Sequence, residues 1–285
     1  MKNKGYVIMA VVILSALSCE REARNVTLPE FDHKLVVTSF ISPRDSVSFV
    51  TVESNERLYG DLSIREPLGE INVAISDGSK RIALEKGDYY FFFQRKYMAV
   101  QEGKKYTLEV SAANGMKADA ECTVPLSRDL NISADTSRIY STDPDGGKLS
   151  ELKIKVYLDD PAGEKNYYRF AAKQMDYDPS YGRYPIIWDL YNEEKLWFSD
   201  EGYDGNRIYA NSARCPSFSK VSDSVKVVIY ILNTNKDYFL YHKSLEEYSG
   251  GDGPFSEPSP VFSNINGGIG IFAGYTVDSL VFRLK

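Results

Sequence analysis

The sequence predicts a mostly β fold, in which an N-terminal immunoglobulin-like β-sandwich is followed by a second β-rich (α+β) domain with one amphipathic helix. Three observations support this class. Apolar and polar residues alternate over many short runs, and turn residues separate these runs at intervals of about 8 to 12 residues. A single stretch near 235–249 has helical spacing instead. The length of 285 residues is consistent with two domains.

Residues 1–18 have the three parts of a secretory signal peptide. Two lysines precede an apolar run over 6–17, and small residues ending in Ser18 close it. The run is too short to span a membrane, because a spanning helix needs about 20 apolar residues. We therefore expect this leader to be removed.

Cys19, the residue after this leader, is the candidate site of lipid attachment. The preceding Ala16-Leu17-Ser18 resembles the lipobox of bacterial lipoproteins, in which the cysteine is acylated. Acyl chains anchor firmly, at about 0.8 kcal/mol for each buried CH2 group, and residues 19–33 then form a lipidated tether. The alternative is ordinary secretion, because Ala16 and Ser18 also fit the A-x-A pattern of signal cleavage.

Charge and cysteine content exclude two classes of protein. The formal net charge is -6, and it becomes -8 when the two leader lysines are lost, so we expect no nucleic-acid partner. Besides Cys19 only Cys122 and Cys215 remain, which is too few for a disulfide scaffold. Cys122 falls on an apolar strand face and Cys215 in a loop before Pro216, so we favour free thiols but leave their pairing open.

Residues 34–125 contain the predicted sandwich domain. Two runs rich in Val, Thr and Phe come first, separated by a Ser-Pro-Arg-Asp turn. Asp-Gly at 77–78 and Asn-Gly at 114–115 are typical of tight hairpin turns. Tyr106 follows Gly-Lys-Lys at the start of the penultimate strand, which resembles the tyrosine corner of immunoglobulin-like domains.

Residues 126–285 contain the second domain. We place the boundary near Pro125 because the following stretch, up to Ser150, has no clear periodicity. Residues 152–158 alternate between apolar and polar types, as a half-buried strand does. Residues 225–232 are apolar almost throughout, which predicts a central strand buried on both faces.

An amphipathic helix near 235–249 follows that strand directly. Thr234 or Asn235 provides a cap at its start, and Gly250 a stop. Its apolar stripe consists of Tyr238, Tyr241, Leu245 and Tyr248. Such a stripe can stack on a ligand, but we expect it to pack against the sheet.

The segment 176–209 is rich in aromatic residues and contains both tryptophans of the chain. Aromatic side chains provide large contact areas at low entropic cost in surfaces that bind sugars and proteins. The candidate ligand or partner contacts are Tyr184, Trp188, Tyr191 and Trp197. The alternative is that the two tryptophans close the core beneath a long β-hairpin insertion.

No catalytic, cofactor-binding or metal-binding residue is predicted. Acidic turns occur at Asp143/Asp145, Asp159/Asp160 and Asp200/Glu201/Asp204. None has the spacing of a calcium-binding loop, and ordinary turn chemistry explains them. The two histidines lack a second ligand at zinc spacing, and no G-x-S-x-G motif occurs, so we expect no enzyme.

The C-terminal region carries a family resemblance. Residues 253–258 (Gly-Pro-Phe-Ser-Glu-Pro) and 263–275, which begin with Ser-Asn-Ile-Asn-Gly-Gly, look like the closing motif of a Bacteroidetes outer-membrane lipoprotein family, domain of unknown function 4249 (DUF4249). The resemblance begins at 34–37 and includes the Asp-Glu-Gly-Tyr-Asp-Gly stretch at 200–205. The four glycines between 267 and 274 indicate a bulged strand or a close approach of two backbones.

This resemblance implies a function, although it assigns no catalytic residue and no cofactor. It implies a lipid-anchored cell-envelope protein of the outer membrane that is accessory to a TonB-dependent transporter in nutrient capture or uptake. Glu20 and Glu22 resemble an export signal, so we expect the protein to face the cell exterior, with the periplasmic side as the alternative. The ligand, a peptide or a glycan, stays open. A structural or adhesive envelope protein is the alternative function, and an uncharacterised hydrolase is third.

Overall fold

The computed structural model describes residues 32–56, 67–142, 146–176, 186–216, 226–249 and 260–283. Nearly all of them belong to one compact unit, made of residues 33–56 and 65–285. Of the other unit, residues 1–32 with 57–64, only Asp32 is described. The predicted leader, Cys19 and Tyr184 lie outside the described residues. In the part of the chain that is described, no helix has the length and apolar character needed to cross a membrane.

The protein is mostly β, as the sequence predicts. The first half contains β1 (Leu35–Ile41), β2 (Val47–Ser54), β3 (Ile71–Ser76), β4 (Arg81–Ala83), β5 (Glu85–Lys86), β6 (Phe91–Gln94), β7 (Lys105–Ala112) and β8 (Lys117–Thr123). The second half contains β9 (Ser133–Thr142), β10 (Lys148–Asp159), β11 (Tyr167–Asp176), β12 (Ile186–Asp189), β13 (Tyr191–Asn192), β14 (Trp197–Ser199), β15 (Arg207–Pro216), β16 (Lys226–Thr234), α2 (Lys236–Ser249) and β17 (Gly268–Arg283). The helix predicted near 235–249 is therefore confirmed.

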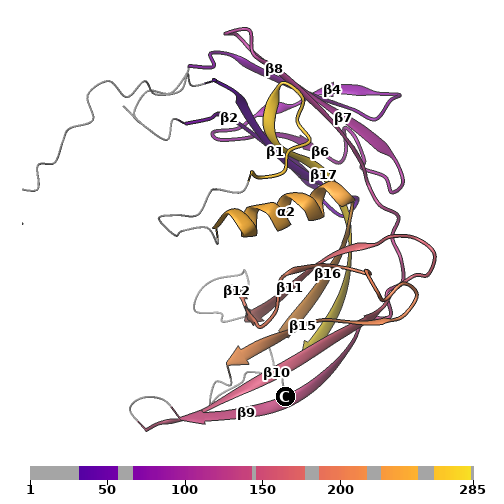
Figure 1. The fold of residues 1–285 in the computed structure, drawn as a ribbon. Helices are drawn as coiled ribbons and strands as arrows, with labels where there is room; N and C mark the ends of the chain where they lie inside the picture. The colour runs from indigo at the N-terminus through magenta and orange to yellow at the C-terminus, as the bar shows by residue number, and fades with distance from the viewer. Residues whose placement is uncertain are drawn as a thin grey trace, which may run out of the picture. The chain divides into compact units, whose positions relative to one another are not determined.

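The largest sheet has nine strands and extends through both halves of the chain (Figure 1). Its order is β12-β11-β16-β17-β1-β2-β6-β5, and β14 also pairs with β11. The first part of β17 pairs in parallel with β1, and its second part pairs in antiparallel fashion with β16. The sheet thus crosses the boundary expected near Pro125, and the division into two domains stays a prediction.

The first hydrophobic core lies between the β1-β2-β6 part of this sheet and the four-stranded sheet β4-β3-β7-β8. Tyr106 is fully buried in it, and its hydroxyl accepts a hydrogen bond from the Gln101 backbone N–H at 2.7 Å. This is the geometry of a tyrosine corner. Phe272 of β17 also belongs to this core, so the C-terminal strand completes the N-terminal sandwich.

The second hydrophobic core lies between β11, β16 and β17 on one side and the sheet β13-β15-β10-β9 on the other. β16 is central, as expected: Val227, Ile229 and Ile231 are fully buried in this core. On its opposite face Val228 and Thr234 are buried, whereas Tyr230 and Leu232 are only partly buried, so the expectation of burial on both faces is confirmed in part.

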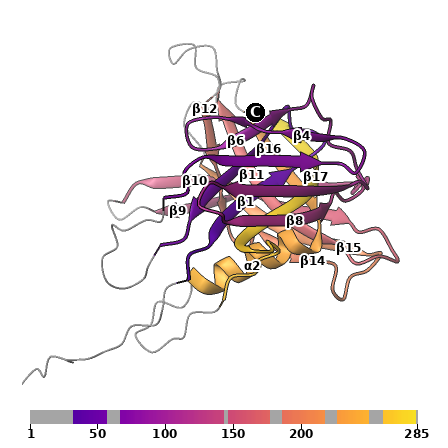
Figure 2. The same ribbon diagram turned by 90° about the horizontal axis from the view of Figure 1, so that it is seen from above.

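Helix α2 lies on the side of β11 and β16 that is turned away from β9, β10 and β15 (Figure 1). It contacts β11, β14 and β17, and Figure 2 shows it next to β14 and β17. Tyr238 of its stripe is buried against Ile271 and Ala273 of β17, and Tyr241 is partly buried there. Leu245 and Tyr248 are exposed. The stripe therefore packs on the sheet in its first half only.

Both described cysteines are buried. Cys122 lies in the first core, as expected. The loop expected around Cys215 is wrong: this residue lies on β15, and its thiol contacts Gln174 Oε1 at 3.1 Å. The polar pair Asn211-Ser212 hides the strand pattern in the sequence, because both residues are buried. Burial raises the pKa of the Cys215 thiol to about 11, and burial also raises that of Cys122, so neither is a reactive thiolate.

The glycines before and within β17 allow close backbone approach, as the sequence predicts. A Cβ atom on Gly270, whose φ is +120°, would lie 2.1 Å from the Val37 carbonyl oxygen of β1. A Cβ on Gly268 would lie 2.6 Å from the Leu35 carbonyl oxygen. The Ser263 hydroxyl accepts hydrogen bonds from the N–H groups of Ile265 and Gly270, which fixes the preceding turn.

Replacing Gly270 with alanine should destabilise the protein by about 3 kcal/mol or more, because the new methyl group collides with the neighbouring strand at a φ that L-residues avoid. Gly115→Ala is the matched control, since Gly115 also has a positive φ but open space around its Cβ position. It should cost only about 1 kcal/mol. Urea unfolding measures the loss of stability in each variant. Equal losses in Gly270→Ala and Gly115→Ala would contradict the close approach of β17 to β1.

Candidate functional site

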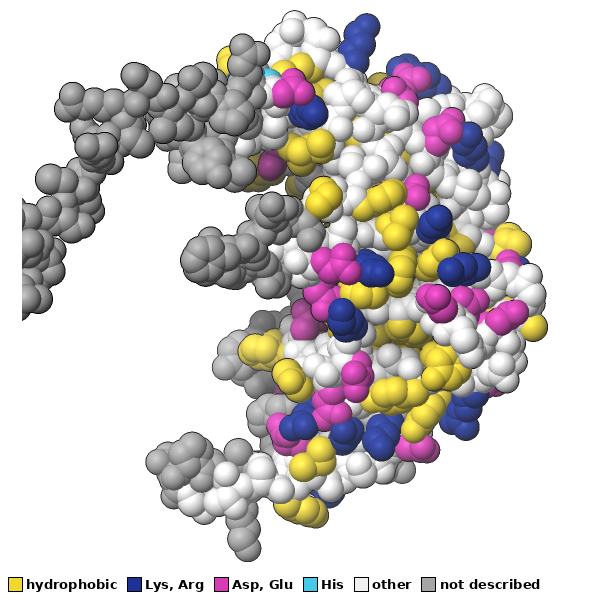
Figure 3. Space-filling model, in the orientation of Figure 1, with side chains coloured by type: hydrophobic (Ala, Val, Ile, Leu, Met, Phe, Trp, Pro, Cys, Tyr) yellow, Lys and Arg dark blue, Asp and Glu magenta, His cyan; other side chains and the backbone are white. Residues whose placement is uncertain are grey.

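A groove lies beside α2, over the part of the large sheet formed by β11, β16 and β17. It consists of two adjoining hollows of about 630 and 450 Å3, whose walls share Arg169 and Leu196. The larger hollow covers the sheet face, and the smaller one lies between the helix and residues 194–197. We call both together the α2 groove. On the side of the molecule seen in Figure 1, acidic, basic and hydrophobic side chains are intermingled (Figure 3).

Strand alternation decides which side chains line the α2 groove. On β11, Arg169, Ala171 and Lys173 are partly buried and line the groove, whereas alternate residues are buried in the second core. The neighbouring strands contribute Tyr230, Leu232, Tyr275 and Val277. The floor of the groove is therefore apolar. Of the two basic side chains from β11 along one side, Lys173 forms an ion pair with Asp189 of the same hollow.

Arg169 is the polar centre of the α2 groove. Its Nη1 donates a hydrogen bond to the Tyr238 hydroxyl at 2.6 Å and lies 3.2 Å from His242 Nε2. Among the described residues, no carboxylate forms an ion pair with Arg169. A guanidinium whose contacts are neutral groups has donors left for a planar anion such as a carboxylate.

His242 supports Arg169 rather than acting as a proton donor. Its ring stacks on Phe40 at 5.5 Å between centroids and lies 4.5 Å from the ring of Tyr238. Burial, and then the charge of Arg169, lower the pKa of His242 to about 4. The imidazole is therefore neutral at pH 7, and its Nε2 can accept from the guanidinium.

The structure separates the aromatic residues that the sequence singles out. Trp188 on β12 is 58% exposed and Tyr191 on β13 is 67% exposed. Neither lines the α2 groove. Trp188 does not close a core, so the alternative of a buried pair of tryptophans is wrong for this residue. The contact role of both residues stays a prediction.

Trp197 does line the α2 groove. Its indole N–H donates to the Glu246 carboxylate of α2, and its ring packs edge-on against Phe239 at 5.3 Å. The Lys195 ammonium lies 4.7 Å from the ring centroid of Trp197. Trp197 thus joins β14 to the helix and forms a partly buried wall of the groove.

Sequence reasoning missed Arg169, the residue with the most distinctive chemistry in the groove. In the sequence it is an ordinary polar residue at an alternate position of a strand. Its neighbours Tyr238 and His242 come from a helix about 70 residues later in the chain. Only the fold brings these three residues together.

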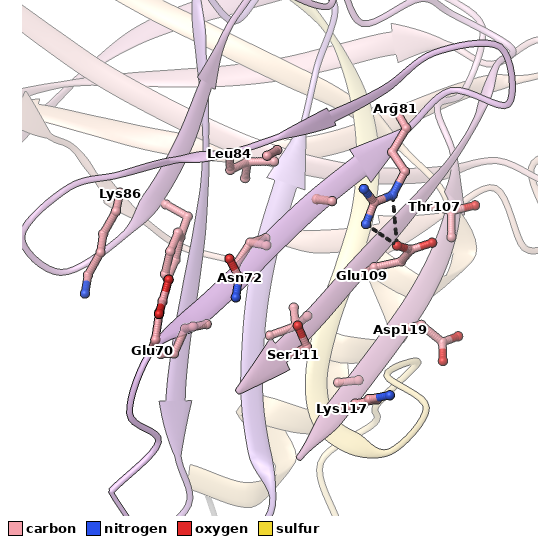
Figure 4. Close-up of a pocket in the computed structure, with 17 residues that line it drawn as sticks. Glu70, Asn72, Arg81, Leu84, Lys86, Thr107, Glu109, Ser111, Lys117 and Asp119 are labelled. Carbon is pink, nitrogen blue, oxygen red and sulfur yellow. Dashed lines mark hydrogen bonds and ion pairs between the residues drawn. The ribbon is translucent and has the colours of Figure 1, made fainter. Parts of the chain in front are cut away.

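A second cavity, of about 850 Å3, lies over the outer face of β4, β3, β7 and β8 (Figure 4). Arg81 reaches across this sheet to Glu109 and forms an ion pair of 2.7 Å with it. Its charged lining residues are Glu70, Arg81, Lys86, Glu109, Lys117 and Asp119. Acidic and basic groups are thus balanced in number, as they are in the α2 groove. The difference between the two is that Arg81 is already paired with a carboxylate, whereas Arg169 has no such partner among the described residues.

The burial of His242 predicts a pH dependence of stability. Because its native pKa of about 4 lies below the unfolded value of 6.5, the unfolded chain takes up a proton first as the pH falls. The free energy of unfolding should therefore fall between pH 7.5 and pH 5, by about 2 kcal/mol more in the wild type than in His242→Gln. Urea unfolding of both proteins at both pH values measures this difference. The same change in the free energy of unfolding in the wild type and in His242→Gln would refute the prediction.

Comparison with known proteins identifies a family but no characterised relative. No curated protein matches the chain. The model of one family, described as "Domain of unknown function (DUF4249)", matches residues 22–280. This range includes both cores, the α2 groove and the glycine-rich motif. The chain therefore belongs to the DUF4249 family.

Proposed function

We propose that the protein is a non-enzymatic, lipid-anchored component of the outer membrane, accessory to a TonB-dependent transporter in nutrient capture or uptake. The lipobox-like residues before Cys19 support the anchor. The α2 groove supports a binding role, and the observation that carries it is Arg169, a guanidinium without a described carboxylate partner on an apolar floor. The family resemblance supports the choice of partner.

The chemistry of the groove suits a ligand or partner segment that presents a carboxylate next to an apolar group. A volume of about 630 Å3 is in the range of small-molecule and peptide sites. Arg169 would bind the carboxylate, while Leu232 and Val277 contact the apolar part. An acidic peptide or an acidic glycan would meet this requirement.

Binding is a better match than catalysis for the residues in this groove. His242 is neutral at pH 7 and already contacts Arg169 through Nε2, so it is poorly placed to transfer protons. The two described cysteines are buried with raised thiol pKa values. We therefore keep the hydrolase as the least favoured function.

If the groove docks a transporter, affinity purification of the tagged protein from native membranes in mild detergent should recover that transporter. Arg169→Gln should reduce the recovered amount about tenfold or more, because a buried charged hydrogen bond is lost. Arg81→Gln, which changes an arginine of the other cavity, should leave it unchanged. Recovery of the wild-type protein alone at low salt would contradict the proposed binding to a transporter.

Lipid attachment is tested separately. Mass spectrometry of the protein from its native envelope should show an acylated Cys19 at the start of the chain. Cys19→Ala should move the protein from the membrane fraction to the soluble fraction. An unacylated, freely soluble wild-type protein would remove the anchor from the proposal while leaving the groove intact.

The alternative, a structural or adhesive envelope protein, is favoured by exposed aromatic residues outside the groove. Tyr89 is 89% exposed and Tyr140 is 74% exposed, and such side chains supply contact area to a partner surface. Deletion of the gene distinguishes the two functions. Reduced nutrient uptake favours the accessory role, whereas normal uptake with altered surface attachment favours the adhesive role.

A further inference from the structure

Three aspartates from two loops converge at one end of the second core. Asp160 follows β10, whereas Asp200 and Asp204 belong to the turn between β14 and β15. One carboxylate oxygen of each lies within 4.8 Å of the others. This separation is about twice the 2.3–2.6 Å length of a bond between calcium and oxygen, so a single calcium ion can reach all three.

These carboxylates are held in place but not neutralised. Asp160 is only 6% exposed and Asp200 only 4%, while Asp204 is open to solvent. Within the described residues, no lysine, arginine or histidine forms an ion pair with any of the three. The folded chain therefore concentrates negative charge where water has little access.

Neutral donors orient each carboxylate. Asp160 accepts hydrogen bonds from the Tyr168 hydroxyl at 2.6 Å and from the Gly205 N–H at 3.0 Å. The Asn166 N–H donates to Asp200 Oδ2, and the Gly163 N–H donates to Asp204 Oδ1, both at 2.8 Å. A carboxylate oxygen that accepts one hydrogen bond has a second lone pair free for a cation.

Asn166 provides an independent observation that points to a ligand. It is 6% exposed, and its buried Oδ1 has no hydrogen-bond partner. Asn166 and Asp200 face each other one residue beyond the last ladder pair, Tyr167 with Ser199. There the Asp200 N–H donates to the Asn166 carbonyl, and the Asn166 N–H donates to the Asp200 carboxylate. Directly opposed residues of an antiparallel ladder place their side chains on the same face. The unpartnered Oδ1 is therefore aimed to the side of the ladder that carries the Asp200 carboxylate.

We propose that the carboxylates of Asp160, Asp200 and Asp204, together with the Asn166 amide oxygen, bind a calcium ion. Four protein oxygens leave room for two to four waters in the usual shell of about six to eight. Zinc is disfavoured because no described histidine or cysteine belongs to the cluster. Magnesium demands a tighter octahedron, with bonds of about 2.0–2.1 Å. The bound ion would fasten the loop after β10 to the β14–β15 turn.

The sequence conceals this site because its ligands lie about 40 residues apart. Each acidic turn taken alone lacks the spacing of a calcium-binding loop, which is why no metal site is predicted from the sequence. The convergence exists only once Asn166 stands opposite Asp200 at the start of β11.

Thermal unfolding of the full-length protein, in EDTA and in excess CaCl2, tests the proposal. Calcium should raise the Tm of the wild type by about 5 °C or more, since a ligand that binds only the folded state stabilises it. The same concentration of magnesium should give less than half this shift. Asp204→Asn, an exposed position, should abolish it, whereas the neighbouring control Glu201→Gln should keep it.

The sign of the Asp204→Asn effect separates a cation site from a structural role. In EDTA this variant should be as stable as the wild type or more so, because one like charge is removed; in calcium it should be less stable. Terbium supplies a readout in the native state. Emission sensitised by nearby tyrosines such as Tyr168 should appear, be displaced by calcium, and require at least about tenfold more terbium in Asp204→Asn. The proposal would be overturned if calcium did not raise the Tm of the wild type, or if it raised the Tm of Asp204→Asn by the same amount.

Discussion

The parallel pairing of β17 with β1 is the contact on which the rest of the structure depends. It holds only because Gly268 and Gly270 let the two backbones approach more closely than any side chain would allow. From this position β17 sends Phe272 into the first core, and Leu280 and Phe282 against the second. The first and second hydrophobic cores therefore share one strand, and the loss of that strand would expose both cores to water.

The same strand determines where the α2 groove lies. Asn264, just before β17, bonds to both the N–H and the C=O of Phe272, and its amide also donates to Asp237 in the first turn of α2. The helix is thereby fixed over Ile271 and Ala273. The sheet face farther along β17 is left open beside it, and there Arg169 has neutral neighbours. Structural glycines and a binding groove are thus two results of one arrangement.

Much of the fold could be predicted from the sequence, because it rests on local patterns. Alternation marks β7 and β10, helical spacing marks α2, and the glycine-rich motif indicates close backbone approach. Where local patterns were misleading, burial was the reason: Asn211 and Ser212 are polar residues inside a core strand, and the loop predicted around Cys215 is a strand.

The candidate sites could be predicted only in part. Trp197 was singled out by its type, and it does line the groove. Arg169 and Asn166 could not be found in this way, because their importance comes from partners that the tertiary structure supplies. Residue type suggests what a side chain can do, whereas strand register decides what it meets. For this reason, sites built from several loops are the hardest feature to predict from a single sequence.

The pairing of Leu35 with Gly268 also has a consequence for biogenesis, because more than 200 residues separate the two strands. During synthesis β1 emerges long before its neighbour exists, and contacts of such long range are slow to form. Until the last segment arrives, one edge of β1 stays unpaired and attractive to other chains. A chaperone that delays collapse would suit such a polypeptide, and proteases would clear copies that end prematurely.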